Sequence, residues 1–169
     1  MIEEEEITAL QECRTRKRFN MMTEEEQIAA VQEYWTNIVY IDNPSEAVKL
    51  AAVTNDGYTI KYIKNPSEEI QLAAVTTYSD AIDYIKNPTE AVQLASVTKR
   101  GYTIKYIKNP SYAIKLAAVT NNGWAIVWIE NPSEELQLAA VNYDGWAIEY
   151  IKNPTEHVKI VAELCKVHP

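Results

Sequence analysis

Proline recurs along this chain at a fixed spacing of 22 residues, and this period constrains the fold more than any other feature of the sequence. Six of the seven prolines follow an asparagine, and the six asparagines are Asn43, Asn65, Asn87, Asn109, Asn131 and Asn153. A strict period of this size indicates stacked supersecondary units. We therefore expect a repeat architecture in which each unit contacts mainly its neighbours in the sequence.

The clearest repeat, residues 44–65, has the sequence pattern of two short helices. Its first half carries a Leu-Ala-Ala-Val core at helical spacing, and a second short helix is predicted over Tyr58–Lys64. Neither helix is long enough to be stable alone, so stacking must stabilise both. The predicted fold class is all-α, a right-handed α-solenoid of about six and a half two-helix repeats.

The predicted organisation has three parts. Six helical hairpins span residues 22–153, with boundaries at 22–43, 44–65, 66–87, 88–109, 110–131 and 132–153. A half repeat at 154–169 is expected to cap the C-terminal end. Residues 1–21 are expected to form a helix that caps repeat one, because Glu3–Glu6 at its start and Arg14–Arg18 near its end both complement the helix dipole. A basic contact to a partner through Arg14–Arg18 is the alternative for this segment.

The recurring asparagine, proline, glutamate and glycine residues of each repeat suggest where its helices begin and end. The six asparagines are predicted to be N-caps, since proline follows each of them at a position suited to the first helical residue. A glutamate three residues after most of these asparagines is expected to bond back to the cap, as in a capping box. Gly57, Gly101, Gly123 and Gly145 are expected to end the first helices in the left-handed conformation.

The helical pattern also predicts which residues are buried. On the first helix of residues 44–65, Val48, Leu50, Ala51, Ala52 and Val53 are expected to face neighbouring helices, with Lys49 outside. One aromatic column is interpreted as core, and its members are Tyr40, Tyr62, Tyr84, Tyr106, Trp128 and Tyr150. A second column is expected to be partly exposed, and it consists of Tyr58, Tyr102, Trp124 and Trp146.

Composition and charge exclude several classes of protein. The formal net charge of −8 argues against general nucleic-acid binding, which depends on Lys and Arg. No secretory signal is recognisable at the start, and no apolar run is long enough to span a bilayer. Cys13 and Cys165 are too few for a disulfide scaffold and are wrongly spaced for a metal site. We expect a cytoplasmic protein with no membrane association.

Catalytic and metal-binding motifs are absent from the sequence. No phosphate-binding loop, dinucleotide fingerprint, zinc-protease motif or Cys-x-x-Cys pair occurs. The two histidines, His157 and His168, lie near the C-terminus without a ligand-type partner, and His157 is expected to be exposed. The repeated glutamates sit where capping explains them better than acid–base catalysis. The sequence predicts no enzyme activity, no catalytic residue, no metal and no cofactor.

The repeat consensus supports a resemblance. The pattern G-(Y/W)-x-I-x-Y-I-x-N-P-S-E-x-(V/I)-x-L-A-A-V resembles a repeat family of unknown function found in phages, giant viruses and bacteria. It is more distantly similar to HEAT-like repeats and to the variant leucine-rich repeat, which shares an Asn-Pro-Ser/Thr step. The resemblance covers residues 44–160 well and 22–43 weakly. It implies an α-solenoid that binds other proteins, such as a phage-type inhibitor or adaptor acting on a host defence protein, and it supplies no catalytic residue.

Exposed positions that break the repeat are the candidates for partner binding. The strongest departures from the consensus lie in repeats four to six, which also hold three of the four tryptophans. The predicted protein-binding residues are Lys99, Arg100, Tyr112, Trp124, Val127, Glu130, Tyr143 and Trp146. The alternative is a nucleic-acid or phosphate binder that uses a ladder of lysines. That ladder comprises Lys61, Lys64, Lys86, Lys105, Lys108 and Lys152, and pairing with glutamates one turn away is its simpler explanation.

Overall fold

The structure is a computed structural model that describes the backbone of residues 4–167 and the side chains of residues 8–166. Glu3, where the N-terminal helix was expected to begin, and His168 lie outside these described residues, as do the side chains of Glu4–Ile7. Throughout the described residues the chain is helical and contains no strand, which confirms the predicted all-α class. The right hand and the number of solenoid repeats stay predictions.

Long and short helices alternate along the chain. The α-helices are α1 (Glu4–Asn20), α2 (Glu24–Glu33), α3 (Glu46–Asn55), α4 (Glu68–Thr77), α5 (Glu90–Lys99), α6 (Tyr112–Asn121), α7 (Glu134–Tyr143) and α8 (Glu156–Val167). The six 3-10 helices are η1 (Trp35–Tyr40), η2 (Gly57–Tyr62), η3 (Ser79–Tyr84), η4 (Gly101–Tyr106), η5 (Gly123–Trp128) and η6 (Gly145–Tyr150). Each α-helix from α2 to α7 is followed by one 3-10 helix, so the two-helix unit inferred from the sequence is present.

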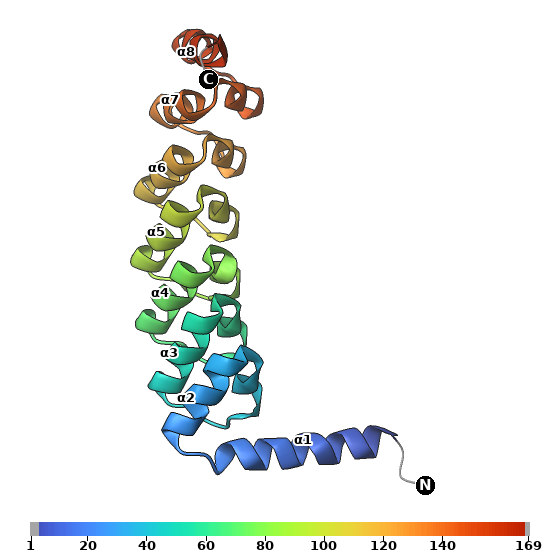
Figure 1. Cartoon of the computed structure of the whole chain (residues 1–169). Coiled ribbons are helices and arrows are strands. Elements are labelled where there is room, and N and C mark those ends of the chain that lie inside the picture. Colours follow the sequence, from blue (N-terminus) through green and yellow to red (C-terminus); the bar gives the residue numbers. More distant parts are fainter. Residues whose placement is uncertain (1–3, 168–169) are drawn as a thin grey trace. The chain divides into compact units, whose positions relative to one another are not determined.

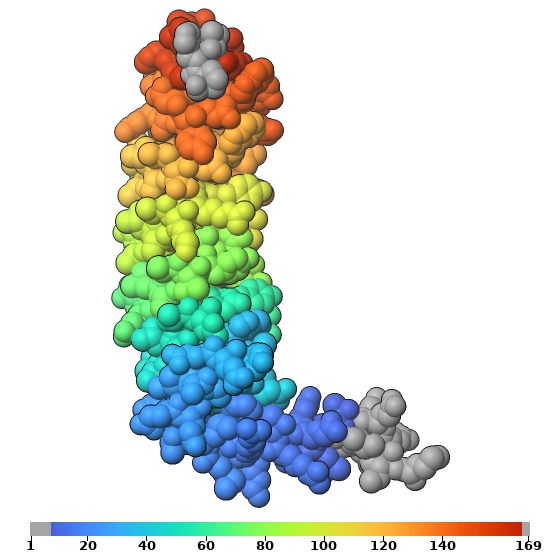
Figure 2. Space-filling view, viewed as in Figure 1, coloured from blue at the N-terminus to red at the C-terminus, as the bar shows by residue number. Residues whose placement is uncertain are grey.

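The chain divides into two compact units, residues 1–81 and residues 82–169. In the second unit, α5–α8 pack consecutively as one row, and η4–η6 form a second row against them (Figure 1). In the first unit, α2–α4 and η1–η2 repeat this arrangement. Figure 2 shows each unit as successive bands of sequence colour, because segments adjacent in sequence pack against one another.

The second helix of each pair is a 3-10 helix rather than an α-helix, which changes which residues share a face. A 3-10 helix has three residues per turn, so residues three apart lie one above the other. Gly57, Ile60 and the following Ile63 therefore form one column, and all three are buried. Tyr58 and Lys61 share the next column, which is more exposed.

The N-cap prediction is wrong for the repeated asparagines. The helices begin two residues later, and the caps are Ser45, Ser67, Thr89, Ser111 and Ser133, each of which accepts a hydrogen bond from a backbone N–H in the first turn. The structure instead places Asn43, Asn65, Asn109, Asn131 and Asn153 at φ between 47° and 57°. Asparagine tolerates this left-handed conformation better than other residues with a Cβ, which explains its place in the turn.

The repeated glutamates are therefore the first helical residues, not partners in an asparagine capping box. Their carboxylates reach the cap of the next repeat instead: Ser111 Oγ donates to Glu90 Oε1 at 2.7 Å, and Thr155 Oγ1 donates to Glu134 Oε1 at 2.7 Å. A capping box does form at α2, between Thr23 and Glu26. The glutamate column is structural, as the sequence indicated, but it joins successive repeats.

The glycine prediction is also wrong in mechanism. None of the four glycines has a positive φ, so the left-handed conformation does not explain them. A Cβ added to Gly101 would collide with the backbone carbonyl oxygen of Ala118 on α6, and one added to Gly57 would collide with that of Ala74 on α4. Glycine is required in η2, η4, η5 and η6 because the first residue of each approaches the backbone of the next α-helix too closely for any side chain.

The α-helices bury a narrower face than the sequence pattern suggested. Val48, Ala52 and Val53 are fully buried as expected, but Leu50 and Ala51 are half-buried, and Lys49 is half-buried rather than outside. The reason is that the 3-10 row covers one side of the α-helices and neighbouring α-helices cover two more. Within the described residues, no element covers the fourth side, which we call the leucine face.

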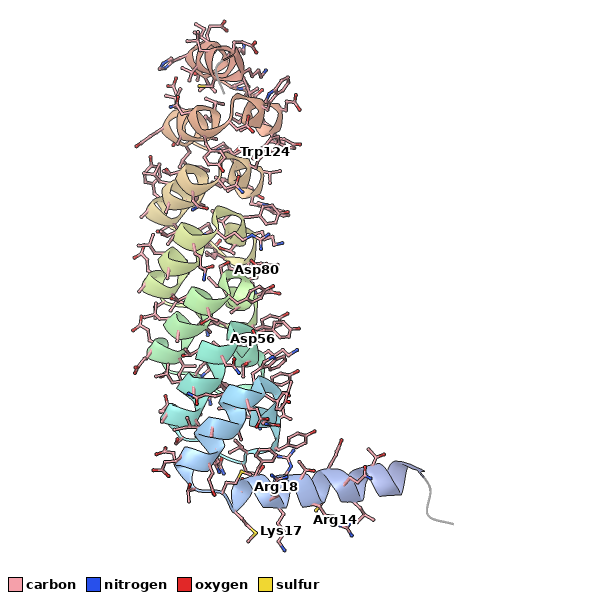
Figure 3. The ribbon with its side chains drawn as sticks, viewed as in Figure 1. Arg14, Lys17, Arg18, Asp56, Asp80 and Trp124 are labelled. Carbon is pink, nitrogen blue, oxygen red and sulfur yellow. The ribbon has the colours of Figure 1, made fainter. Side chains whose placement is uncertain are left out.

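Helix α1 meets the first unit only at its C-terminal end. Phe19 is buried and stacks on Tyr40 at 5.8 Å between ring centroids, and Arg16 Nη1 lies 2.7 Å from Asp42 Oδ1. The side chains of Arg14, Lys17 and Arg18 are exposed on α1 (Figure 3). These contacts fit a capping role for the end of α1, while the side chains of residues 8–14 are exposed.

We expect Gly101→Ala to lower the free energy of unfolding by about 1–3 kcal/mol, the usual range for overpacking, because the new methyl group meets the Ala118 carbonyl. Urea unfolding followed by circular dichroism measures the change. Thr120→Ala is the control, since Thr120 is exposed on the same helix α6, and its effect should stay within about 0.5 kcal/mol. Equal stability of the two variants contradicts the close approach.

The corrected cap assignment predicts that substitution lowers stability more at Ser111 than at the nearby Asn109. Ser111→Ala should cost about 0.5–2 kcal/mol, since it removes the acceptor for the Ile114 N–H. Asn109→Gly should change stability by only a few tenths of a kcal/mol, because glycine adopts the left-handed conformation freely. Thermal unfolding of both variants tests the assignment, and a larger loss at Asn109 than at Ser111 would restore asparagine as the cap.

Candidate functional site

The 3-10 helices of the second unit present a continuous set of aromatic side chains, which we call the aromatic row. Its members are Tyr102, Tyr106, Trp124, Trp128, Trp146 and Tyr150. Edge-to-face contacts join the helices: Tyr102 meets Trp128 at 5.8 Å between ring centroids, and Trp124 meets Tyr150 at 5.1 Å. In such a contact the edge of one ring packs on the face of the other, which fixes the spacing of the two rings.

The aromatic column interpreted as core is in fact largely exposed. Trp128 and Tyr150 are each 47% exposed, and Tyr62 and Tyr84 are exposed as well. The residues one turn earlier in this column, Ala125 and Thr103, are small and fully buried, and the larger aromatic rings extend beyond them toward the surface. The isoleucines spaced by three residues, such as Ile126 and Ile129, are the signal that identifies the true core column.

Trp124 is the best-anchored member of the aromatic row. It is half-buried, and its indole Nε1–H donates to Asp144 Oδ2 at 2.9 Å. The other oxygen of Asp144 accepts from the backbone N–H of Trp146 at 2.9 Å, so one carboxylate links η5 to η6. Figure 3 shows Trp124 on the 3-10 row of the second unit.

The eight residues predicted to bind a partner all lie in the second unit, and seven of them are exposed. The structure groups Trp124 and Val127 on η5 next to Trp146 on η6. Lys99 and Tyr143 lie at the C-terminal ends of α5 and α7, with Arg100 directly after α5. A ten-residue α-helix is about 15 Å long, so the edge of the unit formed by the C-terminal ends of its α-helices is well separated from the edge formed by their N-terminal ends.

Tyr112 and Glu130 lie near the edge formed by the N-terminal ends of the α-helices, since Tyr112 begins α6 and Glu130 precedes the cap of α7. Tyr112 has an internal role there. Its hydroxyl is hydrogen-bonded to Glu135 and Ser133 on the next repeat, and the bond to the Glu135 carboxylate raises the pKa of Tyr112 above its ordinary value. Tyr112 therefore replaces the glutamate of other repeats while keeping a contact between repeats.

The leucine face carries a second apolar surface that the sequence pattern assigned to the core. In the second unit, Leu94 and Ile160 are exposed on this face, and Leu116 is half-buried. Between α5 and α6 it holds a shallow groove of about 480 Å³, lined by Thr98, Ala113, Leu116, Ala117, Thr120 and Asn121. An equivalent groove of about 460 Å³ lies around Leu50 in the first unit.

The lysine ladder separates into two kinds of residue. Lys64, Lys86, Lys108 and Lys152 are exposed, as phosphate binding requires. Lys61 lies over the rings of Tyr58 and Tyr62, with Nζ 3.7 and 4.6 Å from the centroids, and Lys105 lies over Tyr102 and Tyr106 at 4.4 and 4.5 Å. The hydrogen bonds of Lys61 with Tyr58 and then Tyr62 raise the pKa of its ammonium group. These two lysines belong to the aromatic surface.

The described residues contain neither a cluster of metal ligands nor a membrane-spanning helix. No group of three or more His, Cys, Asp or Glu side chains there is arranged to hold a metal ion. His157 is exposed, as expected, with Nδ1 3.5 Å from Glu134 Oε1. In the described part of the chain, every helix is too short or too polar to cross a membrane.

Comparison with known protein families, characterised proteins and solved structures finds no match to this chain.

The contact between Tyr112 and Glu135 predicts a pH dependence. Because the neutral hydroxyl is stabilised by the carboxylate, the folded pKa lies above the ordinary value of 10.0. The contact should therefore stabilise the fold at neutral pH and be lost as the pH rises through the raised pKa. Glu135→Gln should move the titration of Tyr112 to lower pH in NMR spectra of ring-labelled tyrosine.

Proposed function

We propose that this chain is a non-enzymatic, right-handed α-solenoid of about six and a half repeats that binds another protein through its second unit. The family resemblance of the repeat consensus supports a concrete version, in which the protein is a cytoplasmic phage-type inhibitor or adaptor that binds a host defence protein. In this proposal the aromatic row and Val127 form the centre of the interface, with Lys99, Arg100, Tyr143 and Glu130 around it.

The observation that carries the proposal is the exposure of large aromatic side chains on η5 and η6. Trp128 and Trp146 are 47% and 52% exposed, and the apolar Val127 beside them is 47% exposed. Tryptophan and tyrosine are the residues most enriched among interface hot spots, because they bury a large area at a small entropic cost. Rigid, anchored rings such as Trp124 lose little freedom on binding, which favours affinity.

Charge on the same surface favours selective recognition of a protein. Repeat four carries Lys99, Arg100, Lys105 and Lys108, whereas repeat six is acidic. Alternating charge of this kind sets partner specificity and encounter rate more than affinity. The proposed interface therefore combines an apolar aromatic centre with a surrounding rim that carries both positive and negative side chains.

Nucleic-acid or phosphate binding through the lysine ladder is the second candidate, because four of its lysines are exposed. Three observations weigh against it. Lys61 and Lys105 lie over tyrosine rings, and Glu130 interrupts the ladder between Lys108 and Lys152. In the first unit, a cavity of about 560 Å³ is lined by Lys64, Lys49 and Arg16, but Lys49 is paired with Glu46 and Arg16 with Asp42.

We expect the double variant Val127→Lys, Glu130→Lys to fold normally, because lysine occupies both positions in repeats two and four. The same variant should lose capture of the partner in a pull-down from host lysate followed by mass spectrometry. Alanine scanning of comparable interfaces shows losses of about 10-fold or more at central positions. The comparison requires matched melting temperatures for the variant and the parent chain.

The control is Glu33→Lys, Glu69→Lys, which reverses two exposed charges in the first unit. Partner capture should survive this change. If the control abolishes capture and the Val127 and Glu130 variant does not, the interface lies in the first unit. Salt-sensitive retention of the parent chain on heparin, lost in Lys108→Glu, Lys152→Glu, would favour the phosphate-binding function instead.

A further inference from the structure

The 3-10 helices contain a cation–π arrangement built from the chain's own residues. In η2 and η4, a tyrosine begins the exposed column, a lysine follows three residues later, and a second tyrosine comes next. Because residues three apart align in a 3-10 helix, the Lys105 ammonium lies over both rings, with Nζ 4.4 Å from the centroid of Tyr102 and 4.5 Å from that of Tyr106. The two rings form a receptor for a cation, and the lysine fills it.

By sequence, helix η5 carries aromatic rings at both receptor positions and lacks the lysine between them. Trp124 and Trp128 occupy the two ring positions, and Val127 stands where Lys61 and Lys105 stand in η2 and η4. A valine side chain ends at Cγ and cannot reach over the rings. Within the described residues, no lysine or arginine lies over either tryptophan, whereas in η6 the ring of Trp146 is covered by Lys166 from α8, with Nζ at 4.7 Å.

The rings of η5 are also stronger acceptors than those of η4. Tryptophan binds cations better than tyrosine, because its larger π-system has a more negative face. The edge-to-face contacts with Tyr102 and Tyr150, and the bond from Trp124 to Asp144, hold both indoles in place before any ligand arrives. A preorganised site of this kind spends little free energy on ordering.

Negatively charged residues occur around η5, and negative charge favours binding of a cation. Glu130 follows η5 where Lys64 and Lys108 follow η2 and η4, and Glu149 on η6 occupies the lysine position of the neighbouring helix. Both glutamates are exposed. In the sequence, positions 124, 127 and 130 of repeat five therefore hold a tryptophan, a valine and a carboxylate, where repeats two and four hold a tyrosine and two lysines.

We propose that Trp124 and Trp128 bind an arginine side chain of the partner protein, which takes the place that Lys105 occupies over Tyr102 and Tyr106. This inference rests on the proposed function, since it names the group recognised at the same surface. Arginine fits better than lysine, because its planar guanidinium stacks on aromatic rings and loses less hydration than an ammonium. Glu130 and Glu149 supply carboxylates for its N–H groups.

The experiment is an NMR titration of the full-length ¹⁵N-labelled chain with acetyl-arginine-methylamide. The indole N–H signals of Trp124 and Trp128 should shift in a saturable way, while that of Trp35, in the first unit, should not move. The matched control ligand is the citrulline analogue, which has nearly the same shape and no charge. It should bind about threefold to fivefold more weakly, the change expected for one exposed cation–π contact.

Two variants of the chain sharpen the test. Val127→Lys supplies an internal cation, so it should reduce arginine binding by about threefold or more. Lys105→Val is the reciprocal change, and it should create a second, weaker site, seen as new shifts of the η4 backbone amides on addition of the arginine ligand. Valine is already tolerated at the equivalent position of η5, so both variants should fold.

Equal binding of arginine and citrulline, or undiminished arginine binding by Val127→Lys, overturns the cation site. In that case partner capture that is still sensitive to the Val127 and Glu130 variant leaves the protein-binding function standing. Arginine binding with the predicted variant effects, without loss of partner capture in the double variant, instead retains the cation site and refutes the proposed interface.

Discussion

The contact between the 3-10 helices that begin with glycine and the backbone of the next α-helix sets the spacing of neighbouring helix pairs within each unit. At Gly101 a hydrogen atom faces the carbonyl of Ala118, and a methyl group would have to displace that carbonyl. Asn121 reinforces the contact, because its Oδ1 accepts from the Gly101 N–H at 2.6 Å and its Nδ2 donates to the Thr98 carbonyl at 2.8 Å. One side chain thus satisfies backbone groups at the junction between α5 and η4 of the preceding helix pair.

This close approach determines what each unit exposes. Backbones that nearly touch leave room only for small or β-branched side chains between them, which is why Ala118 and Val119 are fully buried. Tyrosine and tryptophan cannot enter such a core, so the 3-10 helices direct them outward. The same constraint leaves the longer Leu116 of the α-helix on the open leucine face. The exposed aromatic row is therefore a consequence of tight packing.

The sequence predicts the helical class and the 22-residue unit because both depend on local signals that every repeat shares. It predicts the wrong cap because Asn109-Pro-Ser111 contains two good capping residues, and only the backbone geometry selects the serine. It predicts the wrong exposed column because the rotation per residue differs by only about 20° between an α-helix and a 3-10 helix. In a segment of six residues this difference is too small to identify the helix type, and only the three-residue spacing of Ile126 and Ile129 indicates it. The partner residues are predicted from departures from the repeat, whereas their division between two edges and the 3-10 row depends on tertiary packing, which no local pattern encodes.

A departure from the repeat indicates binding only where internal packing does not explain it. Tyr112 departs from the glutamate of other repeats, yet its hydroxyl bonds Glu135 and Ser133, so the neighbouring repeat accounts for it. Ser96 departs from the alanine column, and its bond of 2.7 Å to Thr103 accounts for that change as well. Val127 has no such internal partner, because its side chain is exposed. It stands where other repeats have a lysine that covers two aromatic rings. In the sequence it lies between Trp124 and Trp128, which other contacts hold in place. Large exposed rings held in place by internal contacts are typical of interface hot spots, which supports η5, rather than the more divergent edges, as the centre of the proposed interface.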